Sequence, residues 1–137
     1  RVKGALELAH LLLKLAAPEK DANPANWLAA GGRLQQTLPE HPPDLVIDGL
    51  FGIGLDRPLS LPWQAIIQTV NAWSTRVLAL DIPSGLDADT GQALGEPIRA
   101  DFTLAFLAPS LATRLPQAQA WCGQCWLEDL DIEPTRA

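Results

Sequence analysis

The chain has 137 residues, of which 47% are hydrophobic, and this is enough apolar material for a single globular domain over residues 1–137. Its formal net charge of −6 argues against a nucleic-acid partner, because nucleic-acid binding normally uses a basic surface. The apolar stretch at residues 5–17 contains Glu7, His10 and Lys14 and is too short and too charged for a membrane span, so we expect a cytoplasmic protein.

The first third of the chain predicts two helices before the first strand. Leucines between residues 6 and 15 favour a helix, whose opening residues also fit the remnant of a strand. Asn23 followed by Pro24 is typical of a helix start, with Asn23 as the cap and Pro24 at the first helical position. Gly31 and Gly32 then predict the end of this helix. A proline-rich connection leads from there into a strand predicted at residues 45–48.

The rest of the chain predicts a strand–helix–strand unit followed by two more strands. Pro62 opens a helix whose apolar residues follow helical spacing as far as Trp73. The next strand begins at Val77, and further strands are predicted at residues 101–107 and 125–127. Crossovers of this kind make neighbouring strands parallel and right-handed. The predicted fold class is therefore α/β, with a doubly wound, mostly parallel sheet and helices on both faces.

Two of the predicted strands end in an aspartate. Asp48 closes the first strand and precedes a loop with Gly52 and Gly54, and Asp81 closes the second strand and precedes Ser84 in a tight turn. A carboxylate at the end of a buried strand is costly unless a cation or a hydrogen-bond donor meets it. Parallel strands end at the same edge of a sheet, where ligands bind, so these groups predict one site. Either aspartate taken alone also fits the simpler interpretation of a turn cap.

Cys122 and Cys125 match a redox motif superficially. Redox chemistry of this type requires the first cysteine at a helix N-terminus, and the residues after Cys125 do not resemble the start of a helix. We interpret residues 125–130 as the final strand and its exit. A redox protein is therefore the least favoured hypothesis.

Other candidate metal ligands form no recognisable pattern. His10 and His41 show no zinc-ligand spacing. Asp87, Asp89 and Gly91 resemble part of a calcium loop but lack the rest of the EF-hand pattern. We interpret these three residues as a solvated turn.

Residues 48–55, 79–91 and 100–103 resemble the NAD(P)H-hydrate epimerase family, the YjeF N-terminal domain. The resemblance runs from about residue 21 to residue 132, and residues 80–91 are its most specific motif. It implies a Rossmann-like fold, often dimeric, that interconverts the two epimers of hydrated NADH or NADPH in metabolite repair. It thereby implies a small-molecule nucleotide substrate and allows fusion to a C-terminal NAD(P)H-hydrate dehydratase domain in the full-length protein.

The resemblance also implies roles for residues of the predicted site. Asp48 and Ser84 match the family's ligands for one potassium ion (K⁺), and hard oxygen donors suit such a cation. Asp81 matches the acid that contacts the hydrated nucleotide, and a carboxylate in reach of the hydrated ring can also move protons as the catalytic residue. The loop that holds the nucleotide matches Gly52, Ile53, Gly54, Leu55, Asp56, Arg57 and Pro58.

The chain departs from the family pattern in three ways. The family's Asn-Asn-Gly-Gly-Asp loop, which gives a further potassium ligand and phosphate contacts, is absent. Because the chain also has no Met and opens with Arg1, we expect a fragment that lacks the first strand of its sheet. The usual Thr between the loop glycines is Ile53, and residues 110–112 (Ser110, Leu111 and Ala112) replace a Lys-Pro-Gly.

We therefore expect an NAD(P)H-hydrate epimerase domain with at most weak activity in this truncated form. The alternative is a non-catalytic YjeF-type binding or scaffolding module. The missing lysine and Ile53 favour the alternative, whereas Asp48, Asp81 and Ser84 favour the enzyme.

Overall fold

The structure, a computed structural model, describes residues 24–52, 54–106 and 108–128. The helix expected between residues 6 and 15 and the cap expected at Asn23 lie outside these ranges. The described helices are α2 (Pro24–Ala29), α3 (Leu61–Ala72), α4 (Pro116–Cys122) and a short 3₁₀ helix, η1 (Ala112–Arg114). The strands are β1 (Leu45–Asp48), β2 (Arg76–Leu80), β3 (Phe102–Phe106) and β4 (Gln124–Glu128). Within the described residues, no helix is long and apolar enough to cross a membrane.

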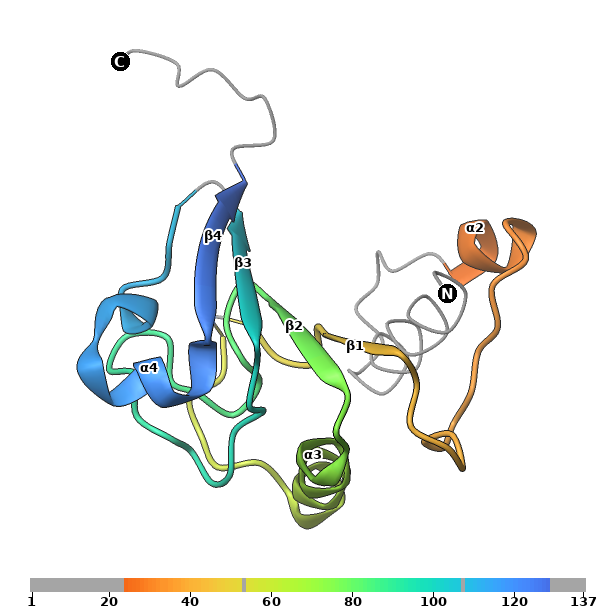
Figure 1. Ribbon diagram of the computed structural model, residues 1–137, viewed down its shortest axis with the longest axis horizontal. Coiled ribbons are helices and arrows are strands. Elements are labelled where there is room, and N and C mark those ends of the chain that lie inside the picture. The colour runs from red at the N-terminus through yellow and green to blue at the C-terminus, as the bar shows by residue number, and fades with distance from the viewer. Residues whose placement is uncertain (1–23, 53, 107, 129–137) are drawn as a thin grey trace.

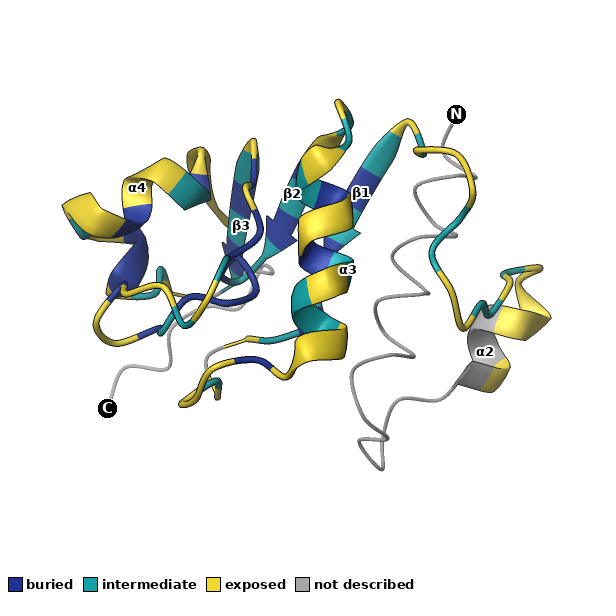
Figure 2. Cartoon of the chain, turned by 90° about the horizontal axis from the view of Figure 1, so that it is seen from below, coloured by how far each residue is buried: buried dark blue, intermediate teal, exposed yellow. Residues whose placement is uncertain are grey.

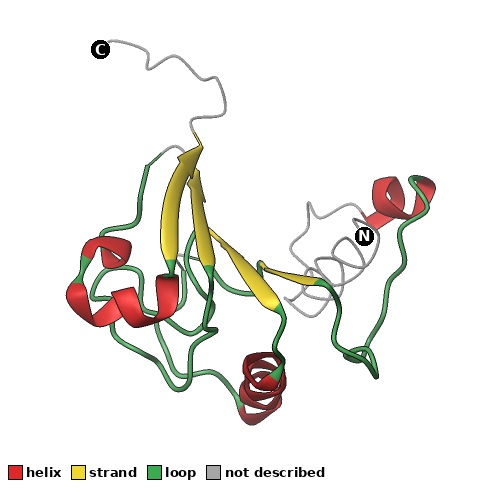
Figure 3. Ribbon diagram, viewed as in Figure 1, coloured by secondary structure: helices red, strands yellow, loops and turns green. Residues whose placement is uncertain are grey.

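The four strands form one sheet in the order β1-β2-β3-β4, and each neighbouring pair is parallel (Figure 1). Helix α3 connects β1 to β2, and η1 and α4 connect β3 to β4. The connection from β2 to β3 is a long loop without helix, drawn in green in Figure 3. The predicted α/β class and the predicted strand–helix–strand unit are therefore confirmed.

Helices α3 and α4 pack on the same face of the sheet. Ala79 of β2 and Thr103 of β3 are register partners, so their side chains point to one face. Ala79 lies in the core cluster with Ile67 and Val70 of α3. The Thr103 hydroxyl donates to the carbonyl of Cys122 at the end of α4, at 2.7 Å. Residues that point to the opposite face in β1, β2 and β3 are half-buried or exposed, so burial alternates along each of these strands.

The core consists of two clusters of buried residues. Figure 2 shows buried and exposed bands along α3, as expected for a helix that covers a sheet with one face. The cluster under α3 contains Val46, Leu50, Leu59, Ile67, Val70, Val77, Ala79, Ile98 and Ala100. The cluster near α4 contains Ile82, Leu86, Ala88, Ala112, Ala118 and Cys122.

Several predicted boundaries match the structure closely. Helix α2 begins at Pro24, and Gly31 has a φ of 85° with its N–H bonded to the Leu28 carbonyl at 3.0 Å, which confirms the predicted helix end. Helix α3 ends one residue before Trp73, and β2 begins one residue before Val77. The strand predicted at residues 101–107 is β3, and residue 107 lies outside the described residues.

The strand predicted at residues 125–127 is confirmed as β4, which begins at Gln124. Helix α4, of which Cys122 is the last residue, was not predicted. Gly123, with a φ of 58°, turns the chain between the two elements, and a Cβ at this position would overlap the Asp101 carbonyl. This tight glycine turn lets a strand follow the helix almost directly.

Candidate functional site

The carboxylate of Asp48 joins the end of β1 to the turn after β2. Its Oδ1 accepts the Ser84 hydroxyl at 2.6 Å and the Leu50 N–H at 3.3 Å, and its Oδ2 accepts the Ser84 N–H at 2.7 Å. Asp48 is 0% exposed. Burial raises the pKa of Asp48, and the hydrogen bonds from Ser84 and Leu50 oppose that rise. The sequence therefore places a fully buried carboxyl group at the edge where the strands end, satisfied by three donors.

No cationic side chain within the described ranges forms an ion pair with Asp48. The same ranges contain no cluster of three or more His, Cys, Asp or Glu side chains that would hold a metal. Asp48 and Ser84 nevertheless bring carboxylate and hydroxyl oxygens together, and these are the donor types that a hard cation takes. A cation would also offset the desolvation of the carboxylate. The two residues therefore fit an alkali-metal ion chemically, with further oxygens needed to complete its shell.

Asp81 has a strained backbone at the end of β2. Its φ is 70°, and no other non-glycine residue in the described part of the chain has a positive φ. The Ile82 N–H donates to the Leu80 carbonyl at 2.9 Å, so Asp81 is the central residue of a three-residue γ-turn. The Asp81 N–H donates to the Leu104 carbonyl at 2.7 Å, which anchors the turn to β3. Left-handed backbone at a residue with a Cβ costs about 1–2 kcal/mol, and such strain is concentrated at functional sites.

The glycine loop after β1 lies against Asp81. A Cβ built on Gly52 would lie 3.7 Å from Asp81 Oδ2, so no side chain stands between the loop backbone and this carboxylate. The Phe51 N–H donates to the Ser84 hydroxyl oxygen at 3.0 Å, which ties the start of the loop to the Asp48–Ser84 pair. The Leu55 N–H donates to the Gly52 carbonyl at 3.4 Å and closes a turn in the loop.

The structure thus brings together four of the predicted site residues. Asp48, Ser84, Asp81 and Gly52 lie at one edge of the sheet, joined by the contacts above. Ile53 lies outside the described residues. Gly54, Asp56, Arg57 and Pro58 are exposed, and Leu55 is half-buried against the core.

The tip of the loop carries a surface ion pair. Arg57 Nε donates to Asp56 Oδ1 at 2.8 Å, and the two side chains are 79% and 72% exposed. The Arg57 guanidinium lowers the pKa of Asp56. Such a pair adds little to stability, so Arg57 is free to exchange its partner for a ligand at small cost.

Two contacts of this loop were not predicted. The Phe51 and Trp63 rings meet edge to face, with centroids 5.3 Å apart and an interplanar angle of 87°. Gln64 Nε2 donates to the Leu59 carbonyl at 2.6 Å. Helical spacing alone predicts no contact between Trp63 and the loop, and a glutamine in the first turn of a helix carries no sequence signal for a bond to the preceding loop.

Comparison with known proteins decides the family. The profile of the family described as YjeF-related protein N-terminus matches residues 6–112. The chain belongs to this family. It is 54% identical over 113 residues to an NAD(P)H-hydrate epimerase of Bordetella pertussis (strain Tohama I), which covers 80% of this chain and 50% of that protein. It is 51% identical over 115 residues to an NAD(P)H-hydrate epimerase of Achromobacter xylosoxidans (strain A8), covering 82% of this chain and 55% of that protein.

A larger relative shares the same region. The bifunctional NAD(P)H-hydrate repair enzyme Nnr of Thermosynechococcus vestitus is 42% identical over 89 residues, which are 65% of this chain and 18% of that protein. This YjeF-related domain therefore spans about half the length of the epimerases it matches and a smaller share of the bifunctional protein.

The segment that replaces the family's Lys-Pro-Gly is tied to the long loop between β2 and β3. The Ser110 hydroxyl donates to the Ala88 carbonyl at 2.9 Å, and the Ala112 N–H donates to the same oxygen at 3.1 Å. Leu111 is exposed. Residues 110–112 therefore have a structural role in this YjeF-related domain and bring no cation to the site.

The turn predicted in the same loop is present, with Asp89 exposed, but Gly91 is buried rather than solvated. Asp87 Oδ1 accepts the Asp89 N–H at 3.0 Å, the Thr90 N–H at 2.7 Å and the Thr90 hydroxyl at 2.9 Å. The hydrogen bonds from Thr90 lower the pKa of Asp87. These contacts occupy the carboxylate within its own turn, as in an Asx-turn.

The cysteines do not form a reactive pair. Cys122 is buried at the C-terminal end of α4, and burial raises the pKa of its thiol to about 12. Cys125 is exposed in β4. A catalytic redox cysteine needs a lowered pKa at a helix N-terminus, so the structure gives the redox hypothesis no support.

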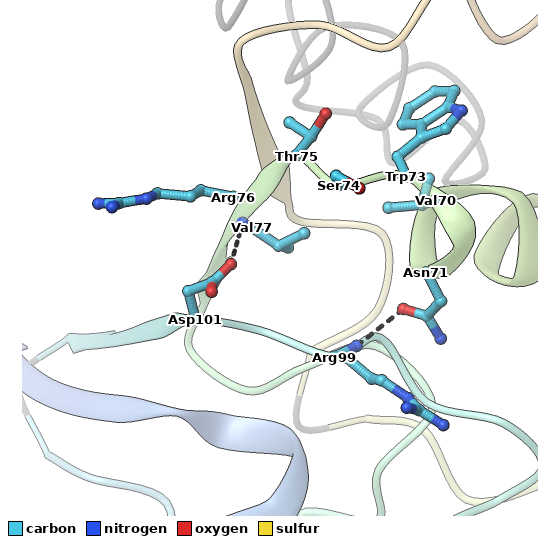
Figure 4. Close-up of a pocket in the computed structure, with 9 residues that line it drawn as sticks. All are labelled: Val70, Asn71, Trp73, Ser74, Thr75, Arg76, Val77, Arg99 and Asp101. Carbon is cyan, nitrogen blue, oxygen red and sulfur yellow. Dashed lines mark hydrogen bonds between the residues drawn. The ribbon is translucent and has the colours of Figure 1, made fainter.

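A cavity of about 280 Å³ lies at the opposite edge of the sheet, where β2 begins (Figure 4). Several of its polar groups are already paired. Asp101 Oδ2 accepts the Val77 N–H at 2.8 Å, and Asn71 Oδ1 accepts the Arg99 N–H at 2.9 Å. Because Asp48 and Asp81 lie at the carboxyl ends of β1 and β2, this cavity is not part of the candidate site.

Proposed function

We propose that the intact protein containing this YjeF-related domain is an NAD(P)H-hydrate epimerase, an isomerase of hydrated NADH or NADPH. The observation that carries the proposal is the cluster of Asp48, Ser84 and Asp81 at the carboxyl edge of the sheet. It occurs in a chain 54% identical to a protein named NAD(P)H-hydrate epimerase. The same similarity argues against the alternative of a non-catalytic module.

Asp81 is the proposed catalytic residue. Asp81 is half-buried, and its carboxylate lies beside Gly52 in a turn with strained backbone. A carboxylate in such a position can hold the ligand and move a proton to or from it. The loop from Gly52 to Pro58 would contact the nucleotide, with backbone amides near its glycines and the Arg57 guanidinium available to phosphate.

Asp48 and Ser84 are the proposed ligands of one potassium ion. Support comes from the buried carboxylate, which has no cationic side-chain partner in the described part of the chain, and from the hydroxyl oxygen 2.6 Å from it. When bound, the ion supplies positive charge at the strand ends and thereby favours an anionic ligand nearby. The chain's own contribution is to hold both oxygens in place through the Phe51 and Leu50 amides.

Three features of the intact protein belong to the same proposal. A fusion to an NAD(P)H-hydrate dehydratase domain is supported by the relative named as a bifunctional repair enzyme. A homodimer is expected from the family resemblance. A cytoplasmic location agrees with the free thiols of Cys122 and Cys125, because disulfides are rare in that compartment.

A chromatographic assay that separates the two epimers of hydrated NADH tests the proposal. Starting from one purified epimer, the intact protein should accelerate the appearance of the other. Asp81→Asn should abolish the acceleration, since the amide cannot exchange the proton. Asp89→Asn is the matched control, because Asp89 is an exposed aspartate of the neighbouring turn. No acceleration by the wild-type protein, or equal rates for wild type and Asp81→Asn, would contradict the proposal.

A further inference from the structure

The first turn of α3 holds both ends of the glycine loop. The loop leaves the sheet at Phe51 and re-enters the core at Leu59, and each of these residues contacts a side chain from the start of α3. The two helix residues are neighbours, Trp63 and Gln64. The seven residues 52–58 are therefore held at both ends by one turn of helix α3.

At the first end, the ring of Phe51 packs against the ring of Trp63. The centroids are 5.3 Å apart and nearly perpendicular, a geometry that adds specificity to an aromatic contact. Both residues also pack against the cluster under α3. The backbone N–H of Phe51 is bonded to Ser84, so this contact sets the loop relative to the Asp48–Ser84 pair as well.

At the second end, the side chain of Gln64 holds the backbone of Leu59. Gln64 Nε2 donates to the Leu59 carbonyl at 2.6 Å, and the Leu59 side chain is 6% exposed in the core. The Gln64 N–H donates to the Ser60 carbonyl at 3.0 Å, so the helix start and the loop exit form one unit.

Among the described residues between these anchors, Leu55 packs against the core and its N–H bonds to the Gly52 carbonyl. A Cβ on Gly54 would meet nothing within 4 Å, and Asp56 and Arg57 contact each other at the exposed tip. With its tip open, the loop depends on its two anchored ends and on Leu55 for its shape. Ordering such a loop on ligand binding costs free energy, and anchors present beforehand reduce that cost.

We propose that Trp63 and Gln64 are positioning residues that preorganise the glycine loop for the nucleotide. This inference rests on the proposed function for the identity of the ligand. The residues act through Phe51 and Leu59 and take no part in proton transfer. Their loss should therefore weaken ligand binding and leave the chemical step in place.

Gln64→Glu in the intact protein tests the proposal, because it removes the N–H donor while keeping the shape of the side chain. Gln68→Glu is the matched control, since it is the same chemical change at an exposed position of the same helix. Gln64→Lys restores a donor of similar reach. Trp63→Leu tests the other anchor. The measurements are KM and kcat for hydrated NADH, thermal unfolding, and hydrogen exchange of the backbone amides of residues 54–57 and 59.

We expect Gln64→Glu to raise KM about three- to tenfold, the effect of losing one hydrogen bond, with kcat changed less than about twofold. The Leu55 amide should exchange faster, Gln68→Glu should match wild type, and Gln64→Lys should recover most of the lost affinity. An unchanged KM and unchanged exchange, or a fall in kcat together with a lower Tm, would overturn the inference. If the wild-type protein has no epimerase activity, the proposed function fails, whereas the exchange measurement still decides whether Gln64 orders the loop.

Discussion

Ser84 donates both its hydroxyl and its backbone N–H to the carboxylate of Asp48, at 2.6 Å and 2.7 Å. The Ser84 hydroxyl oxygen also accepts the N–H of Phe51. One serine therefore connects the end of β1, the start of the glycine loop and the turn after β2. The arrangement of the whole candidate site depends on this residue.

Ser84→Ala should destabilise the protein by about 1–3 kcal/mol, because it removes the hydroxyl that donates to the buried Asp48 Oδ1 and accepts the Phe51 N–H. Urea unfolding measures the change in free energy. Ser74→Ala is the matched control, since Ser74 is exposed at the other edge of the sheet. A free energy of unfolding equal to that of wild type would show that water replaces the hydroxyl without cost.

The raised pKa of Asp48 predicts how stability depends on pH without potassium. A carboxyl group whose pKa is higher in the folded state binds its proton more tightly there, so protonation favours folding. The stability that Asp48 contributes is fully present below its pKa in the unfolded chain. It is lost as pH rises through its higher pKa in the folded protein. The difference in unfolding free energy between wild type and Asp48→Asn should therefore fall across this window. A difference that rises with pH would contradict the assignment.

Potassium should reverse part of that loss. Above the window, where Asp48 is charged, adding potassium chloride should raise the Tm of the intact wild-type protein, because a bound ion stabilises the folded state by mass action. Asp48→Asn should not respond. Tetramethylammonium chloride at equal ionic strength controls for screening, and an equal response to both salts would argue against a specific ion site.

The positive φ of Asp81 predicts a distinct order of stability among its variants. Asp81→Gly should be as stable as wild type or more stable, since glycine adopts left-handed backbone without strain. Asp81→Ala should be less stable than Asp81→Gly by about 1–2 kcal/mol, because alanine keeps the Cβ that causes the strain. Chemical unfolding of both variants provides the comparison. Equal stabilities would mean that the γ-turn relaxes when the carboxylate is removed.

Alanine substitutions at two glycines should have different effects, one on activity and the other on folding. A Cβ on Gly52 would make an ordinary contact with Asp81 Oδ2 at 3.7 Å, so Gly52→Ala should fold normally. Its methyl group would occupy the approach to that carboxylate, so epimerase activity should fall on the order of tenfold or more. Gly85→Ala should instead unfold easily, because its φ is 98° and its Cβ would lie 2.9 Å from the Pro97 backbone. Full activity of Gly52→Ala would place the substrate elsewhere.

The two thiols should differ strongly in reactivity. With a pKa of about 12 and a buried sulfur, Cys122 should not react with a thiol reagent at neutral pH until the protein unfolds. Cys125 is exposed and should react in the folded protein. Mass spectrometry after alkylation, with and without urea, distinguishes the two. Rapid labelling of Cys122 in the native state would revive a redox role.

Much of the site was predictable from local sequence patterns. Apolar runs that end in Asp48 and Asp81, with a helical stretch between them, require a crossover, and parallel strands end at the same edge. The α/β class, the strand positions near residues 45–48 and 77–80, and the gathering of Asp48, Asp81 and Ser84 follow from this logic. Helix α4 was not predicted, although the strand that follows it was, and Gly123 turns the chain directly from one to the other.

Periodicity and turn residues report the backbone preferences of a few neighbouring positions, so the sequence by itself determined the order of the elements and the edge at which the acids lie. Only the tertiary structure decided that Ser84 bonds twice to Asp48, 36 residues earlier, that Asp81 sits in a γ-turn, and that Gln64 holds the Leu59 carbonyl. Each of these contacts depends on side-chain distances between elements. Those distances are set by packing of the whole core, which no local pattern encodes.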